Sequence, residues 1–121
     1  MKDNNPIVQK SKAFAIRIIR LYQHLTAEKK EYILSKQVLR SGTSIGADIR
    51  ESLRAQSTAD FQAKLQIALK EADETQYWLE LLKDTDYISE KAADSLIADC
   101  EEIIRLIVSI VKSSKENKQQ Y

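Results

Sequence analysis

Apolar residues recur along the chain three or four residues apart, which is the spacing of one face of an α-helix. The first such stripe covers 7–25, and Pro6 suits the first turn of a helix there. A second stripe follows Thr26, a suitable N-cap, and extends to about 55–56. The first half of the chain is therefore predicted to form two long helices joined by a short turn.

The second half of the chain repeats this pattern. Ser57 followed by Asp60 resembles a capping box, and apolar residues then alternate at spacings of four and three to about Lys83. Ser89 is the next candidate N-cap, and apolar residues line its helix as far as Ile110. Two further long helices are therefore predicted.

Four helices joined by short turns favour antiparallel neighbours, so we expect an all-α, up-down-up-down four-helix bundle. The composition agrees, because the 121 residues include only two glycines and one proline, and strong helix formers dominate the remainder. Rossmann, barrel and sandwich folds are therefore disfavoured. A chain of this length forms one domain, 1–121, whose polar ends, about 1–6 and 114–121, are expected to fray.

The middle of the second predicted helix is unusual, because small residues and weak helix formers follow one another over 40–49. Gly42 and Gly46 lie one turn apart on one face, where a neighbouring backbone can approach closely. Ser41 and Ser44 can bond to preceding carbonyls or across to another helix. We interpret the segment as a site of close helix packing or a kink.

Pairing the second and third helices about their turn places residue i opposite roughly residue 111 minus i. Arg40 then faces Glu71 and Glu74, and Glu51 lies near Asp60. Ion pairing and helix capping are the roles that these positions predict, ahead of catalysis. The predicted structural polar cluster comprises Arg40, Ser41, Ser44, Asp48, Glu51, Asp60, Glu71 and Glu74.

The third and fourth helices carry more apolar residues than one stripe requires. An isolated bundle needs one apolar stripe per helix, so a wider stripe indicates a further buried face. We interpret this surplus as self-association into a homo-oligomer, with a broad core stripe as the alternative. The candidate interface residues are Ile67, Trp78, Leu81, Ile97, Ile104, Val108 and Val111.

Charge is distributed unevenly, although 19 basic and 18 acidic residues nearly cancel. Residues 1–64 carry 12 basic and 6 acidic groups, whereas residues 65–100 carry 3 and 9. Solvated helix faces that pair with each other explain this pattern, and so does a basic surface for nucleic acid. Because the first helix begins where the fourth ends, Lys10 and Lys12 are expected to share a patch with the C-terminal lysines. The candidate basic residues are Lys10, Lys12, Arg17, Arg20, Lys29, Lys30, Lys36, Lys112, Lys115 and Lys118.

Patterns for catalysis and metal binding are absent from the sequence. One histidine and one cysteine cannot supply a di-iron or zinc site, and no glycine-rich phosphate loop is present. His24 suits a helix C-terminus and Cys100 lies on an apolar stripe, so both are interpreted as structural, with a Cys–His nucleophile as the alternative. We therefore expect no cofactor and no enzyme activity.

The lone cysteine cannot form an internal disulfide, and the N-terminal residues lack the apolar core of a signal peptide. No apolar run approaches the roughly 20 residues that span a bilayer. These features predict a cytoplasmic protein with no membrane contact.

Two stretches of the chain resemble a known family. The first reads Arg40-Ser41-x-x-Ser44-Ile45-x-Ala47-Asp48-Ile49-x-Glu51. The second reads Ser57-x-x-Asp60-Phe61 and then Leu65-x-Ile67-Ala68-x-x-Glu71-Ala72-x-Glu74-Thr75-x-Tyr77-Trp78-Leu79. Together they resemble the bacterial four-helix-bundle family of 23S rRNA intervening-sequence proteins.

The resemblance implies a bundle that assembles into pentameric rings and whose biochemical activity is not established. Relatives include the accessory protein of diversity-generating retroelements, which binds nucleic acid and a reverse transcriptase. The family's motif residues bring no catalytic role. Two positions depart from the family's pattern: Asp48 stands where Asn is usual, and Ser52 where Gly or Ala is frequent. Asp48 lowers the positive potential of its helix.

Two function classes follow from these observations. One is a non-catalytic oligomer that binds the backbone of RNA or DNA, or docks a nucleic-acid-processing protein, through the basic residues. The other is a protein–protein scaffold without a nucleic-acid role, whose charges serve solubility. The near-neutral net charge weakens the first class. Clustering of the basic side chains would favour it, and dispersal would favour the second.

Overall fold

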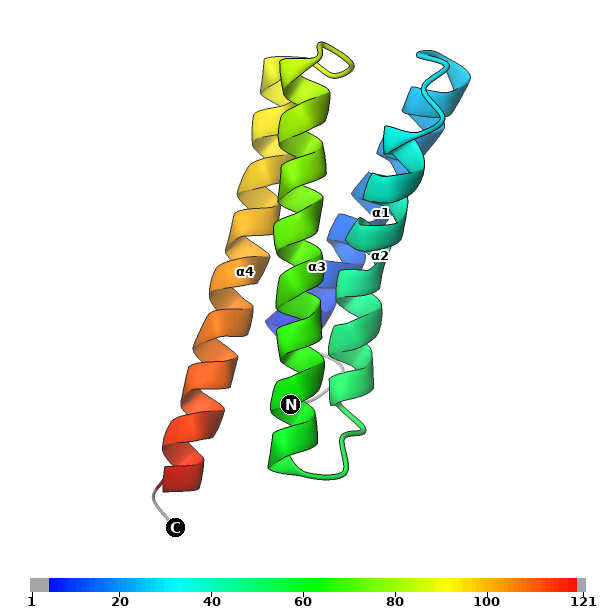
Figure 1. Cartoon of the computed structure of the whole chain (residues 1–121). Coiled ribbons are helices and arrows are strands. Elements are labelled where there is room, and N and C mark those ends of the chain that lie inside the picture. Colours follow the sequence, from blue (N-terminus) through cyan, green and yellow to red (C-terminus); the bar gives the residue numbers. More distant parts are fainter. Residues whose placement is uncertain (1–4, 120–121) are drawn as a thin grey trace.

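The computed structural model describes residues 5–119 and contains four helices arranged as two antiparallel hairpins (Figure 1). Helices α1 (Pro6–Ala27) and α2 (Leu34–Ser52) form the first hairpin, and α3 (Thr58–Asp84) and α4 (Glu90–Gln119) form the second. Each helix runs antiparallel to the next one in the chain, and the described part contains no strand. The predicted all-α, up-down-up-down bundle is confirmed.

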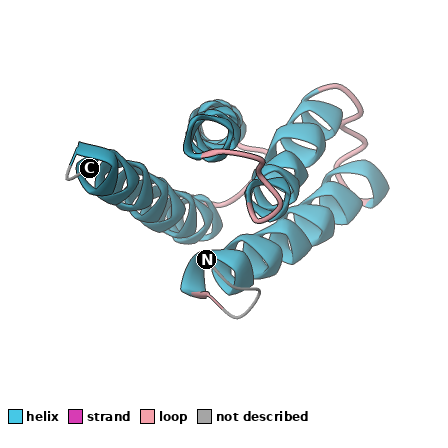
Figure 2. Ribbon diagram, turned by 90° about the horizontal axis from the view of Figure 1, so that it is seen from below, coloured by secondary structure: helices cyan, strands magenta, loops and turns pink. Residues whose placement is uncertain are grey.

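The two hairpins pack chiefly through α2 and α3, whereas α1 and α4 make the fewest contacts of the helix pairs that touch (Figure 2). Apolar side chains from all four helices fill the space between them. Phe14, Ile45, Leu79 and Ile103 are each at most 1% exposed. Burial of such a side chain contributes about 1.5–3 kcal/mol, so this shared core holds the hairpins together.

Both helices of the second hairpin begin at the predicted caps. The Ser57 hydroxyl accepts a hydrogen bond from the N–H of Asp60 at 3.0 Å, and the Asp60 carboxylate accepts one from the N–H of Gln56 at 3.1 Å. The Ser89 hydroxyl accepts one from the N–H of Ala92 at 3.1 Å. These bonds satisfy N–H groups that have no partner within the helix, and the predictions at Ser57 and Ser89 are confirmed.

The predicted start of the second helix at Thr26 is wrong. Thr26 lies in the last turn of α1, where its hydroxyl donates to the carbonyl of Tyr22 at 2.9 Å. Glu31 caps α2 instead, and its carboxylate accepts a hydrogen bond from the N–H of Ser35 at 2.8 Å. Burial acts to raise the pKa of Glu31, but the N–H groups at the start of α2 outweigh it and hold that pKa below its ordinary value.

Two other helix ends differ from the prediction. α2 ends at Ser52, before the expected 55–56, and α4 continues past Ile110 to Gln119. The polar segment after residue 112 consists mainly of good helix formers, which explains the longer helix. Residues 1–4 and 120–121 of the ends predicted to fray lie outside the described residues.

Over residues 5–119, no helix is sufficiently long and apolar to cross a membrane.

The glycines of α2 face α1 at close range. A Cβ atom at Gly42 would lie 2.8 Å from Cγ1 of Ile18, a fully buried side chain, and one at Gly46 would lie 3.4 Å from the hydroxyl of Ser11. α2 is continuous through this segment. Of the two readings of the sequence, close packing is therefore the correct one.

Replacing one glycine at a time by alanine tests the contact of Gly42 with Ile18 and that of Gly46 with Ser11 separately. Gly42→Ala is expected to lower the free energy of unfolding by about 1 kcal/mol, because overpacking against Ile18 costs about 1–3 kcal/mol and improved helix propensity returns about 1 kcal/mol. Gly46→Ala is the matched control and is expected to be neutral or stabilising by up to about 1 kcal/mol. Urea unfolding measures both, and equal effects of the two substitutions would contradict the packing difference.

Candidate nucleic-acid interface

A polar cluster joins α2 to α3. One guanidinium nitrogen of Arg40 lies 2.6 Å from a carboxylate oxygen of Glu74, and the other lies 3.3 Å from Glu71. The side chain of Arg40 is 52% exposed, whereas that of Glu71 is only 20% exposed. The structure thus places these three residues together, at the register that the turn position predicts.

The inner part of this cluster consists of hydroxyl groups that are hydrogen-bonded within the α2–α3 interface. The hydroxyls of Ser41 and Thr75, both fully buried, are hydrogen-bonded to each other at 2.8 Å. Ser44 donates to the carbonyl of Arg40 within α2, and the indole N–H of Trp78 donates to Glu74. These bonds give the cluster a structural role at the α2–α3 contact.

The remaining predicted members of the cluster have separate partners. Glu51 lies 3.9 Å from Lys64 in the second turn of α3, and the Asp60 carboxylate serves at the start of the same helix, as its predicted capping role requires. One carboxylate oxygen of Asp48 is buried without a hydrogen-bond partner. Burial, followed by the negative charges of Glu51 and Glu71, raises the pKa of Asp48, although Lys64 acts in the opposite direction.

Two of the predicted nucleic-acid-binding cations are engaged within the bundle. Lys10 lies 2.5 Å from Glu102, and Arg17 lies 2.6 Å from Asp99. Both pairs link α1 to α4, the contact with the least packing. Lys10 therefore adds no free charge to the patch that we expected it to form with Lys12 and the C-terminal lysines.

Most of the other basic candidates are exposed on the first hairpin and have no carboxylate partner among the described side chains. These are Lys12, Arg20, Lys29, Lys30 and Lys36. Sequence reasoning missed Arg50 and Arg54, which are also exposed and unpaired there; their spacing of one helical turn was the available signal. Lys112 and Lys115 are exposed on α4, and the side chain of Lys118 lies outside those described.

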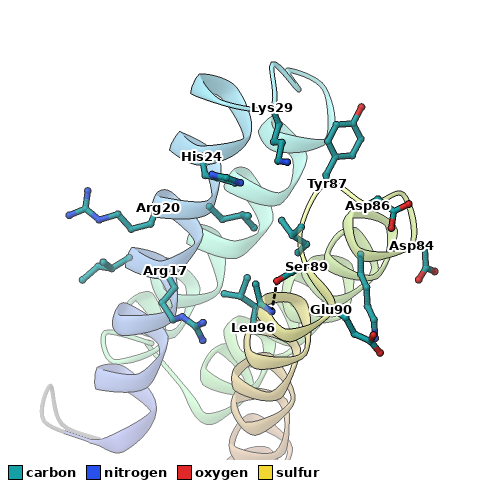
Figure 3. Close-up of a pocket in the computed structure, with 15 residues that line it drawn as sticks. Arg17, Arg20, His24, Lys29, Asp84, Asp86, Tyr87, Ser89, Glu90 and Leu96 are labelled. Atoms are coloured by element: carbon teal, nitrogen blue, oxygen red, sulfur yellow. Dashed lines mark hydrogen bonds between the residues drawn. The ribbon is translucent and has the colours of Figure 1, made fainter.

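A cleft with a volume of about 1070 Å³ separates the second half of α1 from the α3–α4 turn (Figure 3). Arg17, Arg20, His24 and Lys29 line its α1 side. Asp84, Asp86 and Glu90 line the other side, over a floor that includes Leu21, Ile88 and Leu96. Lys83 also lines the cleft, so basic and acidic side chains occur there in similar numbers and this cavity offers a phosphate chain little net attraction.

The residues considered for covalent chemistry are not arranged for it. Burial, followed by the charges of Asp73, Glu101 and Asp99, raises the pKa of Cys100 to about 12, and its thiol donates to the carbonyl of Ala72. The thiolate, which is the nucleophilic form, is therefore disfavoured. His24 lies 3.1 Å from Glu28 at the end of α1. The described part contains no group of three His, Cys, Asp or Glu side chains that could hold a metal ion.

The apolar interface candidates differ in exposure. Ile67 is 46% and Val108 48% exposed, whereas Trp78, Ile97 and Ile104 pack partly buried against the core and Leu81 is half-buried. Val111 is only 5% exposed, because it continues the inward row of α4 after Ile107, so its assignment to an outer face is corrected. The exposed apolar residues that sequence reasoning missed are Ile16, Ile19, Tyr32, Ile33 and Tyr77.

These features define a four-helix-bundle protein with a structural polar cluster at its central helix contact and an excess of unpaired cations on one hairpin. The family model of the 23S rRNA-intervening sequence protein matches residues 3–109, so the chain belongs to that family. The resemblance carried by the motifs of α2 and α3 is confirmed.

The chain is also similar to a solved structure, with 57% sequence identity and a TM-score of 0.87. That structure is a crystal structure, at 1.70 Å resolution, of a protein with unknown function from the S23 ribosomal protein family of Bacteroides thetaiotaomicron VPI-5482. The match covers 88% of this chain and 98% of the other. No curated protein matches the chain.

Arg40 tests how much the exposed side of the polar cluster contributes to stability. A double-mutant cycle between Arg40→Met and Glu71→Gln/Glu74→Gln is expected to give a coupling energy of about 1 kcal/mol in urea unfolding. A half-exposed arginine is screened by water, so the value falls near the upper end of surface pairs and below the 3–5 kcal/mol of buried ones. Fully additive losses would contradict the pairing.

Asp48 makes stability depend on pH. Because the folded state raises the pKa of Asp48, its ionised form is disfavoured in the fold, so Asp48→Asn should stabilise the protein at pH 7 by less than about 1 kcal/mol. The gain should vanish as the pH falls below 3.8, where both states hold the proton. Urea midpoints across pH measure this, with Asp73→Asn on exposed α3 surface as control. A gain that persists at low pH would contradict the electrostatic cause.

Proposed function

We propose that the protein is a non-catalytic, homo-oligomeric, cytoplasmic module that binds the phosphate backbone of RNA or DNA through its first hairpin, α1–α2. The observation that supports this proposal is the set of exposed cations on that hairpin that have no carboxylate partner among the described side chains. They are Lys12, Arg20, Lys29, Lys30, Lys36, Arg50 and Arg54.

Three acidic residues of the same hairpin have partners of their own, and Asp48 is half-buried. Glu28 contacts His24, Glu31 caps α2, and Glu51 pairs with Lys64 of α3. Positive charge is therefore left facing solvent, while most of the acidic surplus lies on the second hairpin. This separation of charge explains how a chain with a formal net charge of +1 can still attract a polyanion.

Assembly is the second part of the proposal. Ile67 and Val108 on the second hairpin, and Ile16 on the first, expose about half of their surface, which is more apolar area than an isolated bundle needs to expose. The family resemblance implies a pentameric ring. Such a ring would repeat the basic hairpin around an axis and multiply weak phosphate contacts without requiring new ones.

The proposal predicts salt-dependent binding that does not depend on sequence. In fluorescence anisotropy, labelled RNA and DNA oligonucleotides of several sequences should bind with similar affinity. The logarithm of the binding constant should fall by about 0.7–0.9 per logarithm of salt for each phosphate contacted. Lys12→Gln/Lys30→Gln/Lys36→Gln, which removes cations without a carboxylate partner among the described side chains, should weaken binding severalfold. Light scattering of the wild type should give about five times 13.9 kDa.

The matched control is Lys10→Gln/Arg17→Gln/Lys83→Gln, which removes the same charge from residues that are already paired with Glu102, Asp99 and Asp94. It should weaken binding less than the unpaired set. An absence of binding at about 50 mM salt would overturn the nucleic-acid function. A mass near 13.9 kDa would overturn the assembly alone.

A protein-docking scaffold is the second candidate function. Tyr32 and Ile33, in the α1–α2 turn, are 52% and 75% exposed and place an apolar surface at the tip of the hairpin. Such a surface suits contact with another protein, including one that processes nucleic acid. An oligomer of the expected mass that binds no oligonucleotide would favour this candidate.

A further inference from the structure

A second cavity, with a volume of about 710 Å³, lies along the outer side of the contact between α1 and α2. We refer to it as the α1–α2 groove. Its lining includes the small residues Ala15, Gly46 and Ala47. Three cations also line it: Lys12 from α1, and Arg50 and Arg54 from the end of α2 and the turn after it.

Close packing of the two helices explains why this groove is present. At Gly46 the helix α2 lacks a side chain, and a Cβ atom there would lie 3.4 Å from the hydroxyl of Ser11. Ala15 and Ala47 extend this contact with single methyl groups. The outer side of the helix pair is therefore recessed at the level of Gly46, and the basic side chains line this recess together with Val8 and Leu53.

The three cations lie at successive levels along the groove. Gly46 packs beside Ser11, so Lys12 is nearly level with Gly46 on the neighbouring helix. Arg50 follows one helical turn further along α2, and Arg54 follows Arg50 by the same four residues. Four residues of helix rise about 6 Å, which separates Arg50 from the level of Gly46, and Arg54 stands in the turn after α2, so the positive charges follow one another along the groove.

Charge balance distinguishes this groove from the cleft of Figure 3. Glu51 is the one acidic residue that lines the groove, and it already pairs with Lys64 of α3. Lys12, Arg50 and Arg54 are exposed and have no carboxylate partner among the side chains that the structure describes. The cleft, by contrast, has Asp84, Asp86 and Glu90 opposite its basic wall.

We infer that the α1–α2 groove binds a single strand of nucleic acid, with consecutive phosphates placed against Lys12, Arg50 and Arg54. This inference rests on the proposed function and adds the surface and the form of the ligand. The groove follows one helix pair, is floored by small residues and has a volume of about 710 Å³, so it suits one sugar–phosphate backbone. A duplex would contact only the rims of the groove, because its second strand would prevent it from entering. None of the described residues that line the groove is aromatic, so base stacking contributes little and sequence preference is small.

Removing charge from the groove tests the inference. Arg50→Gln/Arg54→Gln should weaken binding of a labelled single-stranded oligouridylate of about 20 nucleotides at least tenfold at about 50 mM salt, and should reduce the salt slope by about 1.4. The matched control is Lys70→Gln/Lys91→Gln, which removes two exposed, unpaired lysines from the second hairpin and should change binding little. Oligomer mass and the urea midpoint of each variant verify that the fold is intact.

Filling the groove without a change in charge provides an independent test. Ala47 is exposed on α2 and lines the groove, so Ala47→Leu places a larger side chain in the path of the strand. This variant should also weaken binding of the oligouridylate. Ala98→Leu makes the same exchange at an exposed helical position on α4 and should bind like the wild type.

The outcomes separate this inference from the proposed function. If the wild type binds the oligouridylate, while both groove variants bind as tightly as their controls, the groove assignment is overturned and the proposed function stands. If a duplex of equal length competes as well as the single strand, the form of the ligand is wrong. If the wild type binds poly-glutamate but no oligonucleotide, both proposals fail in favour of an acidic protein partner.

Discussion

The distance between α1 and α2 is the constraint on which the other features of the molecule depend. Ile18 occupies the space that a side chain at position 42 would require, so the two helices can approach only because that position is glycine. Ile18 also lies within the shared core, so this approach aligns the first hairpin with the second. The polar bonds of Arg40 and Ser41 to α3 then form at a register that packing has already determined.

The same close approach also determines the outer surface of the hairpin. Small residues bring the helix backbones together on the inside and leave a recess on the outside, where Lys12 and Arg50 stand at the edges. Elsewhere on α1, Lys10 and Arg17 are drawn into ion pairs that connect it to α4 across the weakest contact of the bundle. Basic residues of one helix thus divide into those that hold the fold together and those available to a ligand.

The one thiol and the one histidine of the chain lie in structural surroundings. Its one thiol is buried in the core with a pKa of about 12, and its one histidine lies beside Glu28 at a helix end. Among the described side chains, the first hairpin exposes cations without a carboxylate partner, such as Lys12 and Arg50. Membership of the 23S rRNA-intervening sequence protein family fits this picture, and the relative from Bacteroides thetaiotaomicron is itself described as a protein of unknown function.

The sequence by itself determined the four helices, the caps at Ser57 and Ser89 and the facing of Arg40 with Glu71, because these depend on helical periodicity and on one short turn. It failed at Thr26, whose hydroxyl bonds back within α1, because a side chain that can cap one helix can equally end another. Only the tertiary structure decided which charges are free. Periodicity predicts the helix face on which a basic residue lies. It does not predict which distant helix supplies a carboxylate partner, as α4 does for Arg17 through Asp99, 82 residues later in the chain.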